Sequence, residues 1–521
     1  MNTTHAVSLK HGLLSLLLLI FVQRTNAQYQ FNNADFCQNV SWNPTSGLNG
    51  YHLSGYFPDC PAGQDCRNIL SDLAPQVLRF PSGGTCKYMH FFDASGNLLV
   101  NDPYIAGDYA GYGYKLSEIA QFIDCYSSDP VITPSWLVSE AAATGCSTAT
   151  IEAGPYSPAQ KEALEEYCDW SNKVTQNGLE TTNFLVDFAD MVTSLQAASG
   201  TTIDILFVAN IITGTDQELK NALEYLVETR GLNVKGVEMG SETYALDFAF
   251  TNFSNYYSYI QGGPSSFSCC PVNHNYVGKI RSNDNSTIRA INIGLCGAPA
   301  GINYTDYFSN VKDLYSSGKD TKYNSWNTDL GNKWNDALGT YTIEGTATVI
   351  NLPRFDAFII HPYYESKFWE TILSMAPAFN STSFTAAGGA INYLTDDASG
   401  NLYQTFERAV REFTYFGKTG FKTQLMDGYY ASKFWLKSNP TNQKRVWLTE
   451  MNLLNGENGG AGGSADKSIF YNTFVQSLYW YMLKQSLVQI NLDRCYTNGG
   501  PIQFAILHNT SGENTGFVSS S

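Results

Sequence analysis

The stretch VKGVEMGSETY, residues 234–244, has the pattern of a buried strand that runs into a turn of small residues. Val237 and Met239 alternate along the strand, and Glu242 follows the turn. In an α/β barrel, the carboxyl ends of the strands carry the residues that perform the chemistry. One acidic residue at a strand end does not define a site. The rest of the sequence must therefore show whether the fold is a barrel and whether a second carboxylate stands in the same setting.

Helical and strand patterns alternate on the N-terminal side of this stretch. Residues 181–197 have apolar side chains at helical spacing, 203–214 contain a continuous apolar run that ends at Asn210, and 217–230 again have a helical pattern. Continuous apolar strands that alternate with helices indicate parallel strands covered by helices. We therefore expect an α/β fold.

Further strand patterns give the number of strands. With one poorly marked strand near the N-terminus, the count is close to the eight of a TIM (β/α)8 barrel. An open, doubly wound sheet is the alternative, but no G-x-G-x-x-G follows any of these strands, so a dinucleotide site is not indicated. The strand patterns lie at 74–85, 203–214, 234–244, 287–298, 355–364, 445–454 and 486–496.

The predicted barrel occupies residues 71–500, between two shorter segments. Residues 28–70 are polar and contain cysteines, and are predicted to form loops with one or two short strands, whereas 501–521 are predicted to be a short polar tail. Long insertions are expected near 101–176, with helices at 116–123 and 158–170, and near 365–442. A further amphipathic helix is predicted at 469–485.

Residues 1–27 have the order of a secretory signal peptide: Lys10 and His11, an apolar core at 13–22, and small residues before Gln28. The apolar core is too short for the ~20 residues that span a bilayer. We therefore expect a secreted, extracellular protein, or one in a lysosome-like compartment, without a membrane anchor. Six N-x-[ST] sequons fit this route and predict a glycoprotein: Asn39, Asn252, Asn285, Asn303, Asn380 and Asn509.

Cysteine content and charge narrow the class of protein further. The 11 cysteines suggest several disulfide bonds, and Cys125, Cys146 and Cys168 fall in one region where local bridges are expected. The net charge of −16 argues against nucleic acid as a partner. Charged residues make up only 15% of the chain, and the abundance of Tyr and Phe suits neutral or mildly charged ligands.

The second carboxylate is Glu450, in the stretch RVWLTEMN at 445–452. Like Glu242, it stands at the end of an apolar strand. Two glutamates on different strand ends of a closed barrel can face each other across its mouth, as in a retaining glycosidase, whose two carboxyl groups lie ~5–5.5 Å apart. One stays ionised as the nucleophile and the other holds a proton as the acid/base, so their surroundings must separate their pKa values.

Other polar residues stand at strand ends. Arg79 is expected to hold the nucleophile ionised, or to form a structural salt bridge in the barrel. Asn210 and His361 offer groups for a sugar hydroxyl or a carboxylate, and a structural role is the alternative for His361. We expect no metal and no cofactor. Four tyrosines suit stacking on a sugar, with packing as the alternative for each: Tyr244, Tyr363, Tyr364 and Tyr496.

Five motifs, in chain order, resemble the successive barrel strands of clan A glycoside hydrolases. They are LRFPSGGTCKYMHFFD, the strand that ends at Asn210, VEMGSE, IIHPYY and VWLTEMN. The resemblance is greatest to glycoside hydrolase family 79, the heparanase and β-glucuronidase family. That family shows an L-R-F-G-G-T strand, an E-L-G-N-E acid/base strand, an H-x-Y-Y strand and a W-L-G-E nucleophile strand.

The resemblance implies residue roles. Glu242 would be the acid/base and Glu450 the nucleophile, with Asn210 and His361 in the site. The run NGENGGAGG at 455–463, with Gly459 and Gly460, resembles the glycine loop that receives a uronate carboxylate; a flexible linker is the alternative.

This chain departs from the family in two places. Ser241 replaces the usual Asn before the acid/base, and only 25 residues follow Tyr496, too few for the family's appended β-sandwich, which is therefore absent or incomplete.

The expected function is hydrolysis of a polysaccharide or glycoconjugate by a retaining, β-glucuronidase-like or heparanase-like mechanism. Two alternatives remain open. One is a glycanase of the same clan that acts on a neutral chain of the xylan, mannan or galactan type. The other is a non-catalytic, carbohydrate-binding relative, which Ser241 and the missing sandwich suggest.

Overall fold

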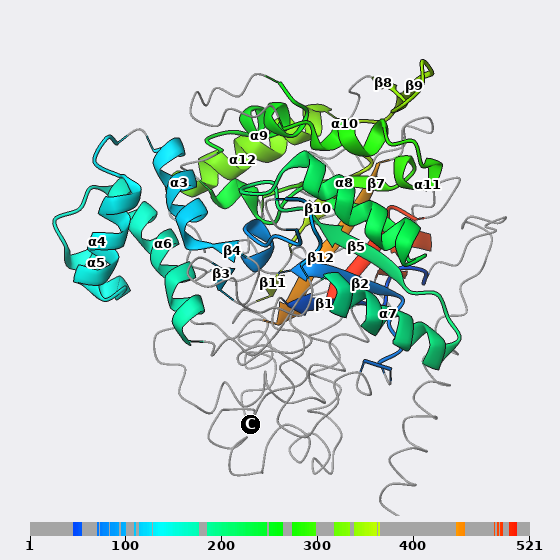
Figure 1. Cartoon of the computed structure of the whole chain (residues 1–521), viewed down its shortest axis with the longest axis horizontal. Helices are drawn as coiled ribbons and strands as arrows, with labels where there is room; N and C mark the ends of the chain where they lie inside the picture. The colour runs from blue at the N-terminus through cyan, green and yellow to red at the C-terminus, as the bar shows by residue number, and fades with distance from the viewer. Residues whose placement is uncertain are drawn as a thin grey trace, which may run out of the picture. The chain divides into compact units, whose positions relative to one another are not determined.

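The structure is a computed structural model of the whole chain (Figure 1). It describes residues 45–54, 70–99, 109–110, 114–176, 185–246, 250–263, 274–298, 317–333, 338–364, 444–453, 484–492 and 500–507, with short gaps inside some of these ranges. All of them belong to one compact unit of the chain, residues 44–521.

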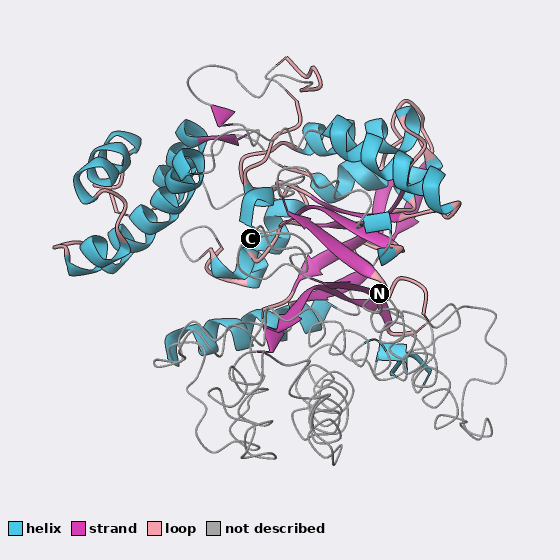
Figure 2. Ribbon diagram, turned by 90° about the horizontal axis from the view of Figure 1, so that it is seen from below, coloured by secondary structure: helices cyan, strands magenta, loops and turns pink. Residues whose placement is uncertain are grey.

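Eight parallel strands form a closed barrel with helices between the strands, which confirms the predicted fold class (Figures 1 and 2). The strands follow one another around the ring in chain order, and the first strand closes it by pairing with the last, with Gly50 opposite Ile506. The strands are β1 (Gly50–Ser54), β2 (Val77–Ser82), β5 (Asp204–Val208), β6 (Asn233–Glu238), β7 (Asn292–Cys296), β10 (Ala357–Ile360), β12 (Arg445–Leu453) and β13 (Ile502–Leu507).

Two hydrophobic clusters hold the barrel, one inside the ring and one outside it. Trp447 is the largest side chain of the inner cluster. A Cβ atom on Gly236 would lie 2.7 Å from its indole, and a Cβ atom on Gly294 would lie 2.4 Å from it. These two glycines therefore make room for the indole. The outer cluster joins strand residues such as Val237 to helix residues such as Leu219. The inner cluster consists of Val77, Leu206, Cys296, Ala357, Ile359, Trp447, Phe504 and Ile506.

Helices connect the strands of the central part of the barrel. The predicted helix at 217–230 is an α-helix that begins at an N-cap, Thr215, whose side chain accepts a bond from the Glu218 amide, and ends in a π-helical turn. The elements are α7 (Leu185–Ser199), α8 (Asp216–Glu224), η2 (Tyr225–Thr229), α9 (Phe253–Ile260), α10 (Tyr276–Arg281), α11 (Ser286–Arg289), α12 (Ser317–Asn332), and a hairpin of β8 (Gly339–Thr342) and β9 (Val349–Leu352).

The insertion predicted near 101–176 contains four helices. Two of them confirm the predicted helices, and two were not predicted. A disulfide bond joins Cys146 to Cys168 across this group, as expected for local bridging. The elements after β2 are η1 (Gly84–Lys87), a short pair of strands, β3 (Tyr109–Ala110) and β4 (Tyr114–Lys115), and then α3 (Leu116–Tyr126), α4 (Pro134–Thr144), α5 (Thr148–Ala153) and α6 (Pro158–Gln176).

His90 connects this insertion to the barrel wall. Its Nε2 lies 3.0 Å from a carboxylate oxygen of Glu118 in α3, and its Nδ1 lies 2.9 Å from one of Glu218 in α8. Burial alone would lower the pKa of His90, but the two carboxylates raise it to about 9. His90 is therefore a charged, buried link between the two parts.

The position of the last barrel strand was predicted wrongly. The described residues of 484–492 are helical, and the strand is β13, inside the segment predicted to be a polar tail. Leu487 and Ile490 are both buried and stand three residues apart, which places them on one face of a helix. Asn491 fixes the entry to β13, because its amide exchanges two hydrogen bonds with the backbone of Ile502, at 2.9 and 3.0 Å.

The start of the barrel also differs from the prediction. β1 lies within the segment 28–70, so the barrel begins near residue 50 and not at 71. Three predictions fall largely outside the described residues: the signal peptide at 1–27, the insertion at 365–442 and the helix at 469–485. Among the residues that are described, no helix is both long and apolar enough to cross a membrane.

Candidate active site

Glu242 stands beyond the carboxyl end of β6, at a strained point of the backbone. The strand ends at Glu238, and Glu242 adopts a left-handed conformation (φ 50°, ψ 36°) directly before a short 3-10 helix, η3 (Thr243–Ala245). Its side chain is 37% exposed. The hydroxyl of Tyr244 donates a hydrogen bond of 2.9 Å to Glu242 Oε1. The carboxylate is thus anchored on one oxygen and open to solvent.

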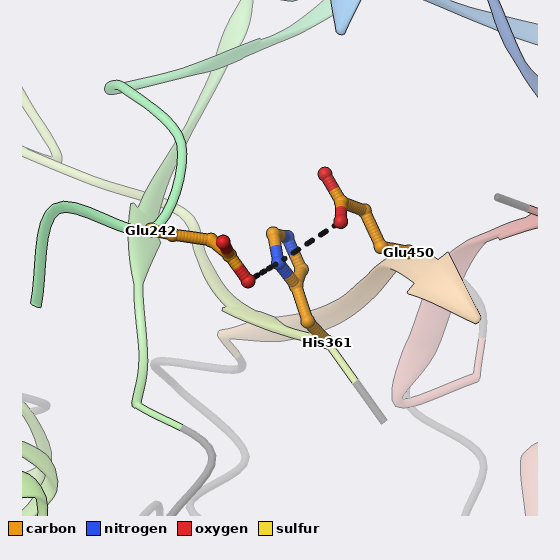
Figure 3. A group of neighbouring side chains, drawn as sticks. All are labelled: Glu242, His361 and Glu450. Atoms are coloured by element: carbon orange, nitrogen blue, oxygen red, sulfur yellow. Dashed lines mark hydrogen bonds and ion pairs between the residues drawn. The ribbon is translucent and has the colours of Figure 1, made fainter. Parts of the chain in front are cut away.

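Glu450 lies inside β12 and is 4% exposed. Its Oε1 accepts a hydrogen bond of 2.7 Å from Arg79 Nη1. Glu242, Glu450 and His361 each place one oxygen or nitrogen atom so that the three atoms lie within 4.8 Å of one another (Figure 3). The barrel therefore brings together the two glutamates that the sequence pairs.

Arg79, in β2, has two carboxylate partners. Its Nε and Nη2 donate to the two oxygens of Glu238 at 2.8 and 2.9 Å, while Nη1 reaches Glu450. The hydroxyl of Ser241 lies 3.4 Å from Nη2. Burial alone would lower the pKa of Arg79, but the two carboxylates raise it well above its usual value. Both predicted contacts of Arg79 are therefore present: a structural salt bridge and an ion pair with Glu450.

His361 follows β10 and lies between the two glutamates. Its Nδ1 is 3.2 Å from Glu242 Oε1 and 3.6 Å from Glu450 Oε2. Its Nε2 is 2.8 Å from the hydroxyl of Thr449 and 3.6 Å from Glu238 Oε1. Burial alone would lower the pKa of His361, but the charge of Glu450 and the contacts with Glu238 and Glu242 raise it to about 10. The imidazole is therefore charged at neutral pH.

The charge on His361 sets the state of Glu242. Partial removal of water by the surrounding protein and the charge of Glu450 raise the pKa of Glu242. The hydrogen bond with His361 and the charges of His361 and Lys87 outweigh both, so the pKa falls below its usual value. Glu242 is therefore ionised in this arrangement, whereas an acid/base must hold a proton. The physical reason is that His361, whose pKa is raised, donates to Glu242 and favours its ionised form.

Glu238 and Thr449 were missed by the sequence reasoning. Glu238 is completely buried, and the Thr449 hydroxyl lies 3.4 Å from its Oε1. A signal for Glu238 existed, because a glutamate within a buried apolar strand requires a cationic partner. Its neighbour Val237 belongs to the outer cluster, so alternation along the strand turns Glu238 into the barrel.

Asn210 does not contribute its amide to this group of residues. Its Nδ2 donates to the Met89 carbonyl at 3.1 Å and to the Thr213 hydroxyl at 3.0 Å. Its Oδ1 accepts from the amides of Ile212 and Thr213, each at 3.0 Å. Asn210 thus shapes the loop after β5, and its prediction as a substrate-binding residue is not supported by these contacts.

The remaining predicted residues are placed in part. Ser241 and Tyr244 lie in the site through the contacts given above. The backbone of Tyr363 belongs to β11 (Tyr363–Tyr364), which pairs with β12, with Tyr363 opposite Asn452. Gly459, Gly460 and Tyr496 lie outside the described residues.

The trio of Glu242, His361 and Glu450 could also offer three ligand atoms to a metal ion. A cation there would share Glu450 with Arg79, which already contacts it at 2.7 Å. The guanidinium of Arg79 therefore already occupies one oxygen of Glu450 that a metal ion could use.

Comparisons of the chain with protein-family models, with curated proteins and with solved structures find no match. The residues of the site therefore carry the functional inference.

Proposed function

We propose that the chain is a secreted retaining β-glycosidase that acts on a polysaccharide or glycoconjugate. One observation carries the proposal: a carboxylate just beyond β6 and one within β12 lie close together, with one oxygen of each within 4.8 Å of the other. Retaining glycosidases need two carboxyl groups ~5–5.5 Å apart, whereas inverting enzymes need a wider gap that admits a water molecule. The disulfide Cys146–Cys168 supports an oxidising, extracellular setting.

Glu450 is the nucleophile in this proposal. It is buried, and its ion pair with Arg79 keeps it ionised for attack on the anomeric carbon. The attack forms a glycosyl–carboxylate bond and breaks the bond between the anomeric carbon and the leaving oxygen. Water then hydrolyses the covalent intermediate and restores the carboxylate.

Glu242 is the acid/base. It protonates the leaving oxygen in the first step and takes a proton from water in the second. Tyr244 and His361 both contact Oε1, which leaves Oε2 for the substrate. A bound sugar removes water from this carboxylate, and desolvation favours its protonated form. Substrate binding thus raises the pKa of Glu242, against the lowering effect of the charged His361.

The substrate class follows from the resemblance to the β-glucuronidase and heparanase family, which favours a uronic-acid-containing chain. A neutral glycan is the second candidate, because two cations of the site, Arg79 and His361, already contact its own carboxylates. Aryl β-glucuronides tested beside aryl β-xylosides, β-mannosides and β-galactosides separate the two.

Glu450→Gln is the direct test. It keeps the size of the side chain but removes the nucleophile, so we expect turnover to fall by at least about 10⁴-fold and labelling by a cyclophellitol-type inhibitor to stop. The matched control is Glu152→Gln, since this side chain is 60% exposed in α5. Undiminished turnover in Glu450→Gln would remove the assignment, and sugar binding without any inhibitor adduct in the wild type would favour a non-catalytic binding protein.

A further inference from the structure

A third carboxylate, Glu238, lies directly beneath the two glutamates of the proposed reaction. It is fully buried in β6, and both of its oxygens accept hydrogen bonds from Arg79. Its Oε1 also lies 3.4 Å from the Thr449 hydroxyl and 3.6 Å from His361 Nε2. Glu238 thus contacts both Arg79 and His361.

The planar guanidinium makes this arrangement directional. Two parallel hydrogen bonds to Glu238 fix the plane and the rotation of Arg79, because a guanidinium matches a carboxylate in a fork geometry. With Nε and Nη2 held in this way, Nη1 points to Glu450 at 2.7 Å. The place of the cation beside the nucleophile is therefore set by Glu238.

A second chain of contacts runs from Glu238 to the acid/base. Protonated His361 donates through Nε2 to Thr449, whose hydroxyl can donate to Glu238, while Nδ1 faces Glu242 and Glu450. The negative charge of Glu238 favours the protonated imidazole. Removing that charge changes the proton content of the site even if every side chain stays in place.

We propose that Glu238 is a positioning residue for the reaction, which aims Arg79 at Glu450 and, with Thr449, holds His361 between the two reacting carboxylates. This inference rests on the proposed glycosidase function. Glu238 acts through these neighbours and does not touch the substrate.

Two variants separate the effect of the charge of Glu238 from the effect of its side-chain length. Glu238→Gln keeps the length of the side chain and removes the charge, whereas Glu238→Asp keeps the charge and shortens the side chain by one methylene group. A misplaced Arg79 should lower kcat on the order of 100-fold with little change in KM, because the lost contact acts at the reacting centre. Both variants should show this loss.

The pH profile of kcat/KM distinguishes the two variants from each other. In Glu238→Gln, a buried negative charge next to the reacting carboxylates is removed, which favours the ionised form of Glu450, so the acidic limb should move to lower pH. In Glu238→Asp, the acidic limb should stay near that of the wild type. A residue with a purely structural role would lower the amount of folded enzyme without moving the limb.

The chain offers a matched control at the opposite end of the barrel. Asp356, directly before β10, accepts a bond of 2.5 Å from Arg281, which is also buried. Asp356→Asn removes one charge from a comparable ion pair, far from the carboxyl ends of the strands. We expect it to lower the melting temperature and to leave kcat, KM and the pH profile unchanged.

A measurement that does not depend on turnover completes the test. In protein labelled with ¹³C-histidine, the resonance of His361, assigned with His361→Gln, should titrate at lower pH in Glu238→Gln than in the wild type. An unchanged titration together with wild-type kcat in folded Glu238→Gln would overturn the inference. If the wild type hydrolyses none of the aryl glycosides, the proposed function fails, and the His361 titration alone then decides whether Glu238 organises the site.

Discussion

Two buried histidines should make the folded chain lose stability as the pH rises through the weakly alkaline range. The pKa of His361 is raised to about 10 and that of His90 to about 9, whereas an unfolded histidine titrates near ~6.5. A raised folded pKa gives a stabilising contribution that is complete below the unfolded value and is lost as the pH rises through the folded value. The loss therefore falls between about pH 6.5 and 10.

The size of the effect follows from counting protons. Between about pH 7.5 and 8.5 each imidazole holds close to one proton in the folded state and almost none in the unfolded state. Each should lower the free energy of unfolding by nearly the full value for one proton, about 1.3 kcal/mol per pH unit, so the two together give about 2.5 kcal/mol per unit. The lowered pKa of Glu242 comes from the same contact with His361. It changes the free energy of unfolding only at acidic pH, so it does not contribute to the slope in this pH range.

Urea unfolding at half-unit steps from pH 7 to 8.5 measures the slope. His361→Gln and His90→Gln should each remove about half of it. His274→Gln is the matched control, because His274 is also buried but its pKa is lowered, so it binds no proton in either state over this range. A His361→Gln slope equal to that of the wild type would refute the assignment of a charged imidazole between the two glutamates.

Two further changes test the packing of the fold. Trp447→Ala should lower the free energy of unfolding by about 3–5 kcal/mol, measured by denaturant unfolding, because the indole is fully buried in the barrel and its removal leaves a cavity. Replacing both Cys146 and Cys168 by Ala opens a loop with a sequence separation of 22 and should cost the insertion about 3 kcal/mol. Hydrogen exchange should then rise in α5 and α6 but not in β6 or β12, and a rise spread evenly over the barrel would contradict this local effect.

The fold could be predicted where the strands are continuous apolar runs. The stretches around Val237 and Trp447 are read correctly because both faces of a barrel strand are buried. The last strand could not be placed in the same way, since a short apolar run such as the one around Ile490 fits a buried helix equally well. The hydrogen bonds of Asn491 that decide between them join separate elements and leave no local pattern.

The sequence could predict only those site residues that follow a recognisable apolar strand. Glu242 and Glu450 are recognisable because each follows an apolar run, and the closed ring then brings them together. The partner of Glu450 is Arg79, 371 positions away in the chain, and nothing near either residue encodes that contact. Asn210 was predicted to bind substrate because its amide stands at a strand end. Its Oδ1 instead accepts hydrogen bonds from the backbone of the loop that follows.

The left-handed backbone at Glu242 has a consequence for the history of this chain. At φ 50° a side chain costs roughly 1–2 kcal/mol relative to glycine, so a lineage selected for stability alone would drift towards glycine or asparagine at this position. The proposed acid/base role would balance this cost. Among homologous chains, the residue at position 242 should therefore separate those able to perform the proposed reaction from those that share only the barrel.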